Sequence, residues 1–200
     1  MAEPGTAYTA AYDVWMADPA AAWARAAEGI EWTRKWDRVF DPDSGPYGRW
    51  FVGGMLNTCH NCLDRHVLAG RGDQPALIWD SAMEGVVRRF TYAQLLDRTA
   101  KVAGALAALG VGRGDRVVIY MPMVPEAAIT MLACARLGAV HSVVFGGFAA
   151  AELAKRITDA EPVVVVTADR QLRQRVLAVG GTAVGPDWLH LRLGDEENFT

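Results

Sequence analysis

Cys59, Cys62 and His66 have the side chains and the spacing of metal or redox ligands. On a helix the three would share one face, because residues three and four positions apart are neighbours there. A structural zinc site takes four ligands, however, and the remaining cysteine, Cys134, lies in an apolar segment. A thioredoxin-like pair would stand at a helix start that follows a strand. We therefore predict that these residues serve packing and that the chain has no metal site.

Asp64, Arg65 and His66 have side chains that suit acid–base catalysis, but no nucleophile or phosphate site accompanies them. We predict instead an ion pair on a helix surface, beside a partly buried histidine. The sequence also has no glycine-rich loop followed by lysine, the pattern that cradles nucleotide phosphates. No residue of this chain is therefore predicted to be catalytic.

Gly146 and Gly147 follow the segment 140–145 (VHSVVF), which predicts a buried strand. Open α/β sheets bind ligands beyond the carboxyl ends of their strands, so this glycine pair lies where a ligand can approach. A tight turn from strand to helix is the alternative interpretation, because glycine adopts conformations that other residues avoid. The spacing is not that of the dinucleotide fingerprint G-x-G-x-x-G.

Arg170, Arg173 and Arg175 form a basic cluster just after another predicted strand, 163–167. The planar guanidinium group pairs with phosphate oxygens, which makes the cluster a candidate phosphate site. A solvated charge cluster is the alternative, and the sequence favours it.

The elements that position these residues alternate between strand and helix from about residue 74. Strands are predicted at 76–79, 88–90, 115–120, 140–145 and 163–167. Helices are predicted from Thr91 to Gly110, at 125–137 and at about 149–160. Glu126 is predicted to place a negative charge in the first turn of the second of these helices. Right-handed crossovers between the strands give an α/β fold, a parallel sheet with flanking helices on both faces.

The first 70 residues differ from this pattern and contain five of the seven tryptophans. Asp18 and Pro19 predict a helix that ends at Gly29, and Asn57 predicts the start of another that ends at Gly70. Large aromatic side chains bury much area per residue, so we predict a small, mainly helical N-terminal lobe packed by them.

Composition argues against several classes of partner. A formal net charge of −3 speaks against nucleic acid and against a polybasic membrane anchor. The sequence starts without a secretory signal pattern, and no uncharged apolar run reaches transmembrane length. Three cysteines, an odd number, fit a reducing compartment. We expect a cytoplasmic protein without nucleic-acid or membrane partners, and the sequence leaves its oligomeric state open.

Four segments of the chain resemble the AMP-forming short-chain acyl-CoA synthetases. They are IEWTRKWDRVFD (30–41), RWFVGGMLNTCHNCLDRHV (49–67), GRGDRVVIYMPMVPEAAITMLACARLGAVHSVVFGGF (112–148) and the strand 163–167. The segments AGRGDQPALIWDS (69–81) and GGFAAAELAKRITDAEP (146–162) are more similar to propionyl- than to acetyl-CoA synthetases. The resemblance implies the first part of an adenylate-forming enzyme fold.

The resemblance also implies a reaction and its ligands. The family activates a carboxylate with ATP and Mg²⁺ to an acyl-adenylate, and the CoA thiol then displaces AMP. Gly147 would lie beside the tunnel that admits the pantetheine arm of CoA. Arg173 would occupy the first of two arginine positions that bind the phosphates of the CoA nucleotide, but the second position holds Val176. At most CoA contacts are therefore expected in this chain, whose substrates would be small molecules.

The resemblance ends after Asp169. Residues 170–200 have no clear helix period and no bounded strand, apart from a weak alternation in WLHLRL, so we interpret them as a divergent tail translated out of frame. The predicted domains are 1–73, the N-terminal lobe of the acyl-CoA synthetases, and 74–169, the start of the AMP-binding domain, followed by this tail.

Two functional interpretations follow from these observations. The first is the N-terminal part of a propionate–CoA ligase, or alternatively of an acetate–CoA ligase, inactive as this chain because the phosphate loop and the catalytic lysine of the family are absent from it. The second is a non-catalytic truncated product.

Overall fold

The computed structural model describes residues 5–145 and 150–194. Contacts divide the chain into two units, Met1–Asn57 and Thr58–Thr200, and each is described by itself. The domain limits that the sequence predicts, at residues 73 and 169, remain predictions. No helix among the described residues is long and apolar enough to cross a membrane.

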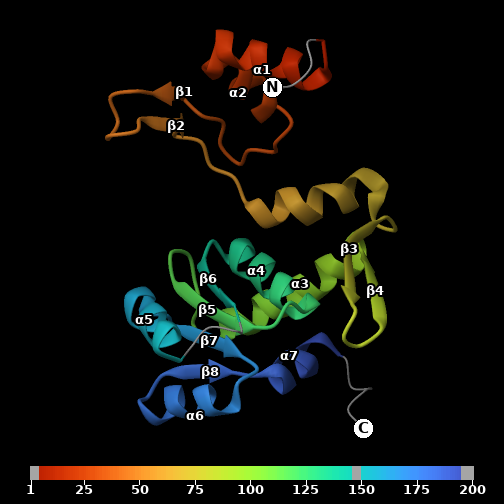
Figure 1. Ribbon diagram of the computed structural model, residues 1–200, viewed down its shortest axis with the longest axis vertical. Coiled ribbons are helices and arrows are strands. Elements are labelled where there is room, and N and C mark those ends of the chain that lie inside the picture. Colours follow the sequence, from red (N-terminus) through yellow and green to blue (C-terminus); the bar gives the residue numbers. More distant parts are fainter. Residues whose placement is uncertain (1–4, 146–149, 195–200) are drawn as a thin grey trace. The chain divides into compact units, whose positions relative to one another are not determined.

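The first unit contains two helices and a hairpin (Figure 1). The helices are α1 (Ala7–Ala17) and α2 (Pro19–Ala27), and the antiparallel strands are β1 (Arg38–Asp41) and β2 (Arg49–Val52). Asp18 caps α2 as predicted, because its carboxylate accepts a hydrogen bond of 2.9 Å from the backbone N–H of Ala21. The hairpin was not predicted.

Aromatic side chains pack the first unit. The rings of Trp32 and Trp36 lie 4.9 Å apart, and Phe51 lies 5.4 Å and 5.2 Å from them. Edge-on and tilted ring pairs of this kind are the favoured arrangements of aromatic groups. The predicted aromatic packing is confirmed for these three rings, whereas Trp15, Trp23 and Trp50 are 39%, 47% and 40% exposed.

The second unit begins with a helical segment that contains the π-helical turns η1 (His60–Asp64) and η2 (Val67–Arg71). The antiparallel pair β3 (Pro75–Ser81) and β4 (Val86–Thr91) follows, and then the long helix α3 (Tyr92–Ala108). Thr91 and Gln94 start α3 with a reciprocal capping box. The predicted strands and helices of this region are confirmed, although β3 and β4 form a sheet of their own.

A four-stranded parallel sheet, in the order β6-β5-β7-β8, forms the centre of the second unit. Its strands are β5 (Arg116–Met121), β6 (Val140–Phe145), β7 (Val164–Thr167) and β8 (Thr182–Val184). The helices between and after them are α4 (Pro125–Leu137), α5 (Ala150–Ala160), α6 (Arg170–Ala178) and α7 (Pro186–Leu193). The predicted parallel sheet is confirmed.

Helices cover both faces of this sheet (Figure 1). Side chains of a strand point alternately to its two faces, so Val117 and Ile119 join the core beneath α3, α4 and α7. Val118 points the other way and packs with residues of α5 and α6. Strands buried on both faces need continuous apolar runs, and the sequences RVVIYM and VVVT supply them.

The prediction that residues 170–200 contain no regular elements is wrong, because α6, β8 and α7 continue the alternation. Leu189 and Leu193 lie four positions apart, which is one turn of a helix, and both are buried in the core. Pro186 at the first helical position and Gly194 just after the last, with φ of 75°, mark the two ends of α7. These helix signals outweigh the alternation in WLHLRL.

Translation out of frame after Asp169 remains a separate prediction. Apolar periodicity that continues through residue 193 is what an in-frame segment would show. Translating the coding DNA downstream of the Asp169 codon in all three frames tests the idea. The prediction of out-of-frame translation is wrong if neither alternative frame encodes a glycine-rich loop followed by lysine.

Glu161 is strained, because it adopts the left-handed conformation, with φ of 43°, between α5 and β7. Arg116 holds this turn through donated hydrogen bonds of 2.8 Å to the carbonyl of Ala160 and 3.0 Å to that of Glu161. Replacing Glu161 by glycine is expected to raise the free energy of unfolding by about 0.5–1 kcal/mol, measured by urea denaturation, because glycine adopts this conformation without strain.

The matched control is Glu152→Gly within α5, which should lower the free energy of unfolding by about 1 kcal/mol. The account of the strained turn is wrong if both substitutions destabilise the protein equally.

Candidate functional site

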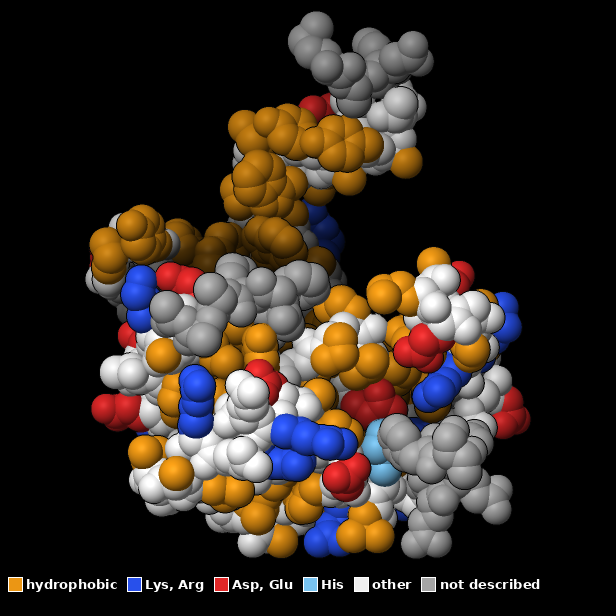
Figure 2. Space-filling model, turned by 60° about the horizontal axis from the view of Figure 1, so that its bottom comes forward, with side chains coloured by type: hydrophobic (Ala, Val, Ile, Leu, Met, Phe, Trp, Pro, Cys, Tyr) orange, Lys and Arg blue, Asp and Glu red, His pale blue; other side chains and the backbone are white. Residues whose placement is uncertain are grey.

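A cavity of about 1050 Å³ opens in the second unit where β5 ends and α4 begins. This is the carboxyl edge of the parallel sheet, where open α/β sheets bind ligands. Figure 2 shows acidic, basic and histidine side chains around a hollow of the molecular surface. The cavity is lined by Trp79, Glu84, Arg88, Arg89, Phe90, Gln94, Asp97, Arg98, Lys101, Val124, Pro125, Glu126, His190, Leu193 and Gly194.

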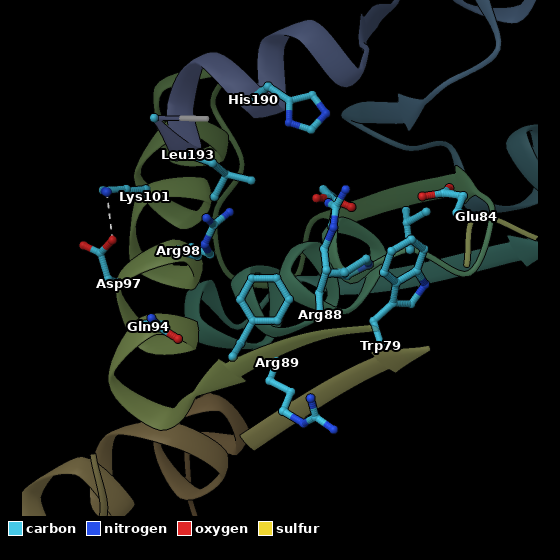
Figure 3. Close-up of a pocket in the computed structure, with 15 residues that line it drawn as sticks. Trp79, Glu84, Arg88, Arg89, Gln94, Asp97, Arg98, Lys101, His190 and Leu193 are labelled. Atoms are coloured by element: carbon cyan, nitrogen blue, oxygen red, sulfur yellow. Dashed lines mark ion pairs between the residues drawn. The ribbon is translucent and has the colours of Figure 1, made fainter. Parts of the chain in front are cut away.

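The β3–β4 hairpin forms one wall and holds the loop before α4. The indole N–H of Trp79 donates a hydrogen bond of 2.7 Å to the carbonyl of Met123. The guanidinium carbon of Arg88 lies 5.1 Å from the ring centroid of Trp79, a cation–π contact. In Figure 3, Trp79 and Arg88 rise from the hairpin toward the other lining side chains, and Arg89 extends from the opposite side of its strand.

Helix α3 forms the opposite wall. The guanidinium carbon of Arg98 lies 5.2 Å from the ring centroid of Phe90. Lys101 and Asp97 form an ion pair of 2.7 Å at the rim (Figure 3). Both side chains of that pair are largely exposed, so it contributes little to stability. In this wall, Lys101 and Asp97 thus neutralise each other, and the guanidinium group of Arg98 contacts an aromatic ring.

Glu126 lies in the first turn of α4, as predicted, and is only 9% exposed although it lines the cavity. Within residues 5–145 and 150–194 its carboxylate makes no hydrogen bond and no ion pair. The sequence indicated its position at the helix start but not its burial in a cavity.

The predicted site residues are only partly placed. Gly146 and Gly147 lie outside the described residues. The guanidinium group of Arg173 lies against Gly185, just after β8, so that a Cβ on Gly185 would overlap it. Because β7 and β8 are parallel, Arg173 reaches the carboxyl edge of the sheet. It is not among the residues that line the cavity.

The other positions of the arginine cluster do not complete a phosphate site. Arg170 and Arg175 are exposed on α6, in agreement with a solvated cluster. Val176 is partly buried and packs against the core between α6 and the sheet, and its apolar side chain has no group that could bind a phosphate. Arg170 also stands near this edge, at the start of α6 just after β7, but the guanidinium group of Arg173 is the one that lies against Gly185.

Cys59, Cys62 and His66 do not come together as ligands. Cys59 is buried and Cys62 is exposed. His66 is half-buried and contacts the ring of Tyr92 at 4.8 Å. Among the described residues, no group of three or more His, Cys, Asp or Glu side chains is placed to hold a metal ion.

Asp64 does not form the ion pair that was predicted on the surface of its own helix; it pairs with a residue far away in the sequence. Two guanidinium nitrogens of Arg136, in α4, donate hydrogen bonds of 2.9 Å and 3.0 Å to its two oxygens. One of them also lies 3.7 Å from the sulfur of Cys59. The hydrogen bonds to Asp64 raise the pKa of Arg136, although partial burial opposes this. This fork-to-fork pair joins the segment before β3 to the central helix α4.

Burial raises the pKa of the Cys59 thiol and raises that of Cys134 to about 12. The folded protein therefore holds these protons more tightly than the unfolded chain does. An unperturbed thiol has a pKa of 9.0, and the buried thiol of Cys134 has one of about 12. The stability that this difference contributes is fully present below pH 9 and is lost as the pH rises towards 12. We expect the free energy of unfolding to fall above pH 9 by about 1.4 kcal/mol per pH unit for Cys134.

Urea denaturation between about pH 7.5 and 10.5 measures this loss, with Cys134→Ala as the control that should flatten the slope. In the same preparation Cys62 should react with a thiol reagent in the folded protein, and Cys59 and Cys134 only in denaturant. Equal slopes for the wild type and the alanine variant would contradict the prediction.

Comparisons with known proteins match almost all of the described chain. Residues 63–190 match the family model described as AMP-binding enzyme, and residues 8–62 match the acetyl-coenzyme A synthetase N-terminus. The chain is 48% identical over 164 residues to the human acyl-CoA synthetase short-chain family member 3, mitochondrial; this match covers 82% of the chain and 24% of the relative.

Two bacterial relatives are similar to the same degree. The acetyl-coenzyme A synthetase of Mycobacterium tuberculosis is 51% identical over 157 residues, which are 78% of this chain and 24% of the relative. That of Deinococcus radiodurans is 51% identical over 152 residues, 76% of this chain and 23% of the relative. The chain spans about a quarter of the length of these relatives.

Proposed function

The chain belongs to the AMP-binding enzyme family, and from this premise we propose that it supplies the N-terminal part of an AMP-forming short-chain acyl-CoA synthetase. The observation that carries the proposal is that two family models cover residues 8–62 and 63–190 without a gap. The relatives are named acyl-CoA or acetyl-coenzyme A synthetases.

The proposed reaction joins a carboxylate to CoA at the expense of ATP. The carboxylate oxygen attacks the α-phosphorus of ATP and pyrophosphate leaves; the CoA thiol then attacks the acyl carbonyl and AMP leaves. Activation is required because a carboxylate resists nucleophiles, whereas AMP is a good leaving group. Mg²⁺ would neutralise the charge that moves on the phosphates.

Within this reaction we propose that the chain contributes CoA contacts and no catalytic group. Arg173 fits a phosphate contact because its cation stands at the carboxyl edge of the sheet, beside the small residue Gly185. Val176 does not fit, because its side chain is apolar and packs, partly buried, against the core. Gly147 remains a proposed neighbour of the pantetheine arm.

For the acyl group we propose propionate, because the segments 69–81 and 146–162 are more similar to propionyl- than to acetyl-CoA synthetases. Acetate is the second candidate, favoured by the names of the bacterial relatives. The substrates would then be small molecules: a short-chain acid, ATP and CoA. We propose a cytoplasmic location for this protein, although the human relative is named mitochondrial.

The 200-residue chain by itself is proposed not to form an acyl-adenylate, because its sequence has no glycine-rich loop followed by lysine. ATP–pyrophosphate exchange with propionate or acetate, ATP and Mg²⁺ tests this. We expect no exchange above a heat-treated control. Exchange that depends on the added acid would show that the chain carries an adenylation site of its own.

A further inference from the structure

The cavity beside α4 contains a carboxylate that no side chain of the described residues pairs with. Glu126 is nine-tenths buried and lines the cavity, yet it has no hydrogen bond or ion pair among the described residues. Its carboxylate oxygens are not among the fully buried side-chain atoms that lack a partner, so they remain accessible from the cavity. A carboxylate in this state accepts hydrogen bonds only, so its complement is a group that carries N–H donors and positive charge.

The hairpin wall presents the opposite charge to the same cavity. The guanidinium group of Arg88 contacts the face of Trp79, and no acidic side chain of the described residues pairs with it. A cation–π contact uses the face of the guanidinium group and leaves its N–H donors, which lie in the plane, for an acceptor. Two parallel N–H donors of a guanidinium group can bind the two oxygens of a carboxylate at the same time.

The surroundings of these two charges narrow the class of ligand. Apolar groups of Phe90, Val124, Pro125 and Leu193 complete the lining, and the volume of about 1050 Å³ suits a small molecule. Asp97 is already paired with Lys101 at 2.7 Å, so it does not compete with Glu126. Metal ions are disfavoured, because no cluster of three metal-ligating side chains exists among the described residues.

We propose that this cavity binds a small zwitterion of the amino-acid class. Its ammonium group would donate hydrogen bonds to Glu126, and its carboxylate would pair with Arg88. An aliphatic spacer between the two charges would pack against the apolar lining. Arg173 does not line the cavity, so this site is distinct from the proposed CoA phosphate contact.

Isothermal titration calorimetry on the 200-residue chain tests the proposal with a set of matched probes. The zwitterions are ω-amino acids of increasing length, from β-alanine to 6-aminohexanoate; hexanoate and hexylammonium each carry one of the two charges. We expect at least one zwitterion to bind about tenfold more tightly than either singly charged probe, because two charged pairs form instead of one.

Variants assign the two contacts. Glu126→Gln and Arg88→Gln should each weaken binding of that zwitterion by about tenfold, and Glu126→Asp, which keeps the charge, should restore part of the affinity. Glu152→Gln and Arg175→Gln, in helices that do not line the cavity, should bind as the wild type does. Thermal melting confirms that each variant is folded.

Three results would overturn the proposal. The first is that no ω-amino acid binds at concentrations up to about 10 mM. The second is that hexanoate binds as tightly as the zwitterions and Glu126→Gln changes nothing, which would leave an anion site at Arg88 alone. The third is a strong coupling between Glu126 and Arg88 in a double-mutant cycle without ligand, which would show that the two residues pair with each other in solution.

Discussion

Replacing Leu189 by alanine is expected to lower the free energy of unfolding by about 3 kcal/mol. Leu189 is 1% exposed and packs in the core that α7 shares with α3 and the sheet. The substitution removes buried methyl groups and leaves a cavity that the rigid sheet cannot close, and both effects destabilise the folded state. Urea denaturation followed by circular dichroism measures the change.

The matched control is Leu191→Ala in the same helix. Leu191 is 59% exposed, so its replacement should change the free energy of unfolding by no more than about 0.5 kcal/mol. If both variants unfold as the wild type does, α7 does not pack on the domain, and the segment after Asp169 is not part of the fold.

Replacing Arg136 by alanine is expected to lower the free energy of unfolding by about 2 kcal/mol. The change leaves the carboxylate of Asp64, which is 20% exposed, without its two hydrogen bonds of 2.9 Å and 3.0 Å. The partial exposure of both side chains makes the effect smaller than for a fully buried pair. Arg136→Lys should recover only part of the loss, because an ammonium group cannot bind both oxygens in the same plane.

A double-mutant cycle with Asp64→Ala isolates this pair from the packing of the two side chains. We expect the double variant to be less destabilised than the sum of the two single variants. Additive effects would mean that the ion pair adds nothing to stability, and that Arg136 acts through packing alone.

The sequence predicted the central sheet well because its signals are strong and local. The segments 116–121 (RVVIYM) and 140–145 (VHSVVF) are rich in β-branched and aromatic residues, and Pro125 and Gly138 mark the ends of α4. The β1–β2 hairpin was missed because its strands, RVFD and RWFV, are only four residues long and do not alternate apolar and polar residues. In the tail, the alternation in WLHLRL concealed a helix whose ends are marked by Pro186 and Gly194.

The candidate site was harder to predict, because its residues come from separate elements. Trp79, Glu126 and His190 line one cavity although no local pattern connects them. Asp64 and Arg136 are 72 positions apart, so only the fold reveals their pairing. Arg173 was identified through the family resemblance, and the structure adds that its guanidinium group lies at the edge of the sheet.

A hybrid enzyme tests the proposed function most directly. In the acetyl-coenzyme A synthetase of Mycobacterium tuberculosis, the segment of 157 residues that matches this chain would be replaced by the corresponding residues of this chain. If the chain supplies the N-terminal part of such a synthetase, the hybrid will form acetyl-CoA from acetate, ATP and CoA, and the relative without that segment will not. A folded hybrid that forms no more acetyl-CoA than the shortened relative would contradict the proposal.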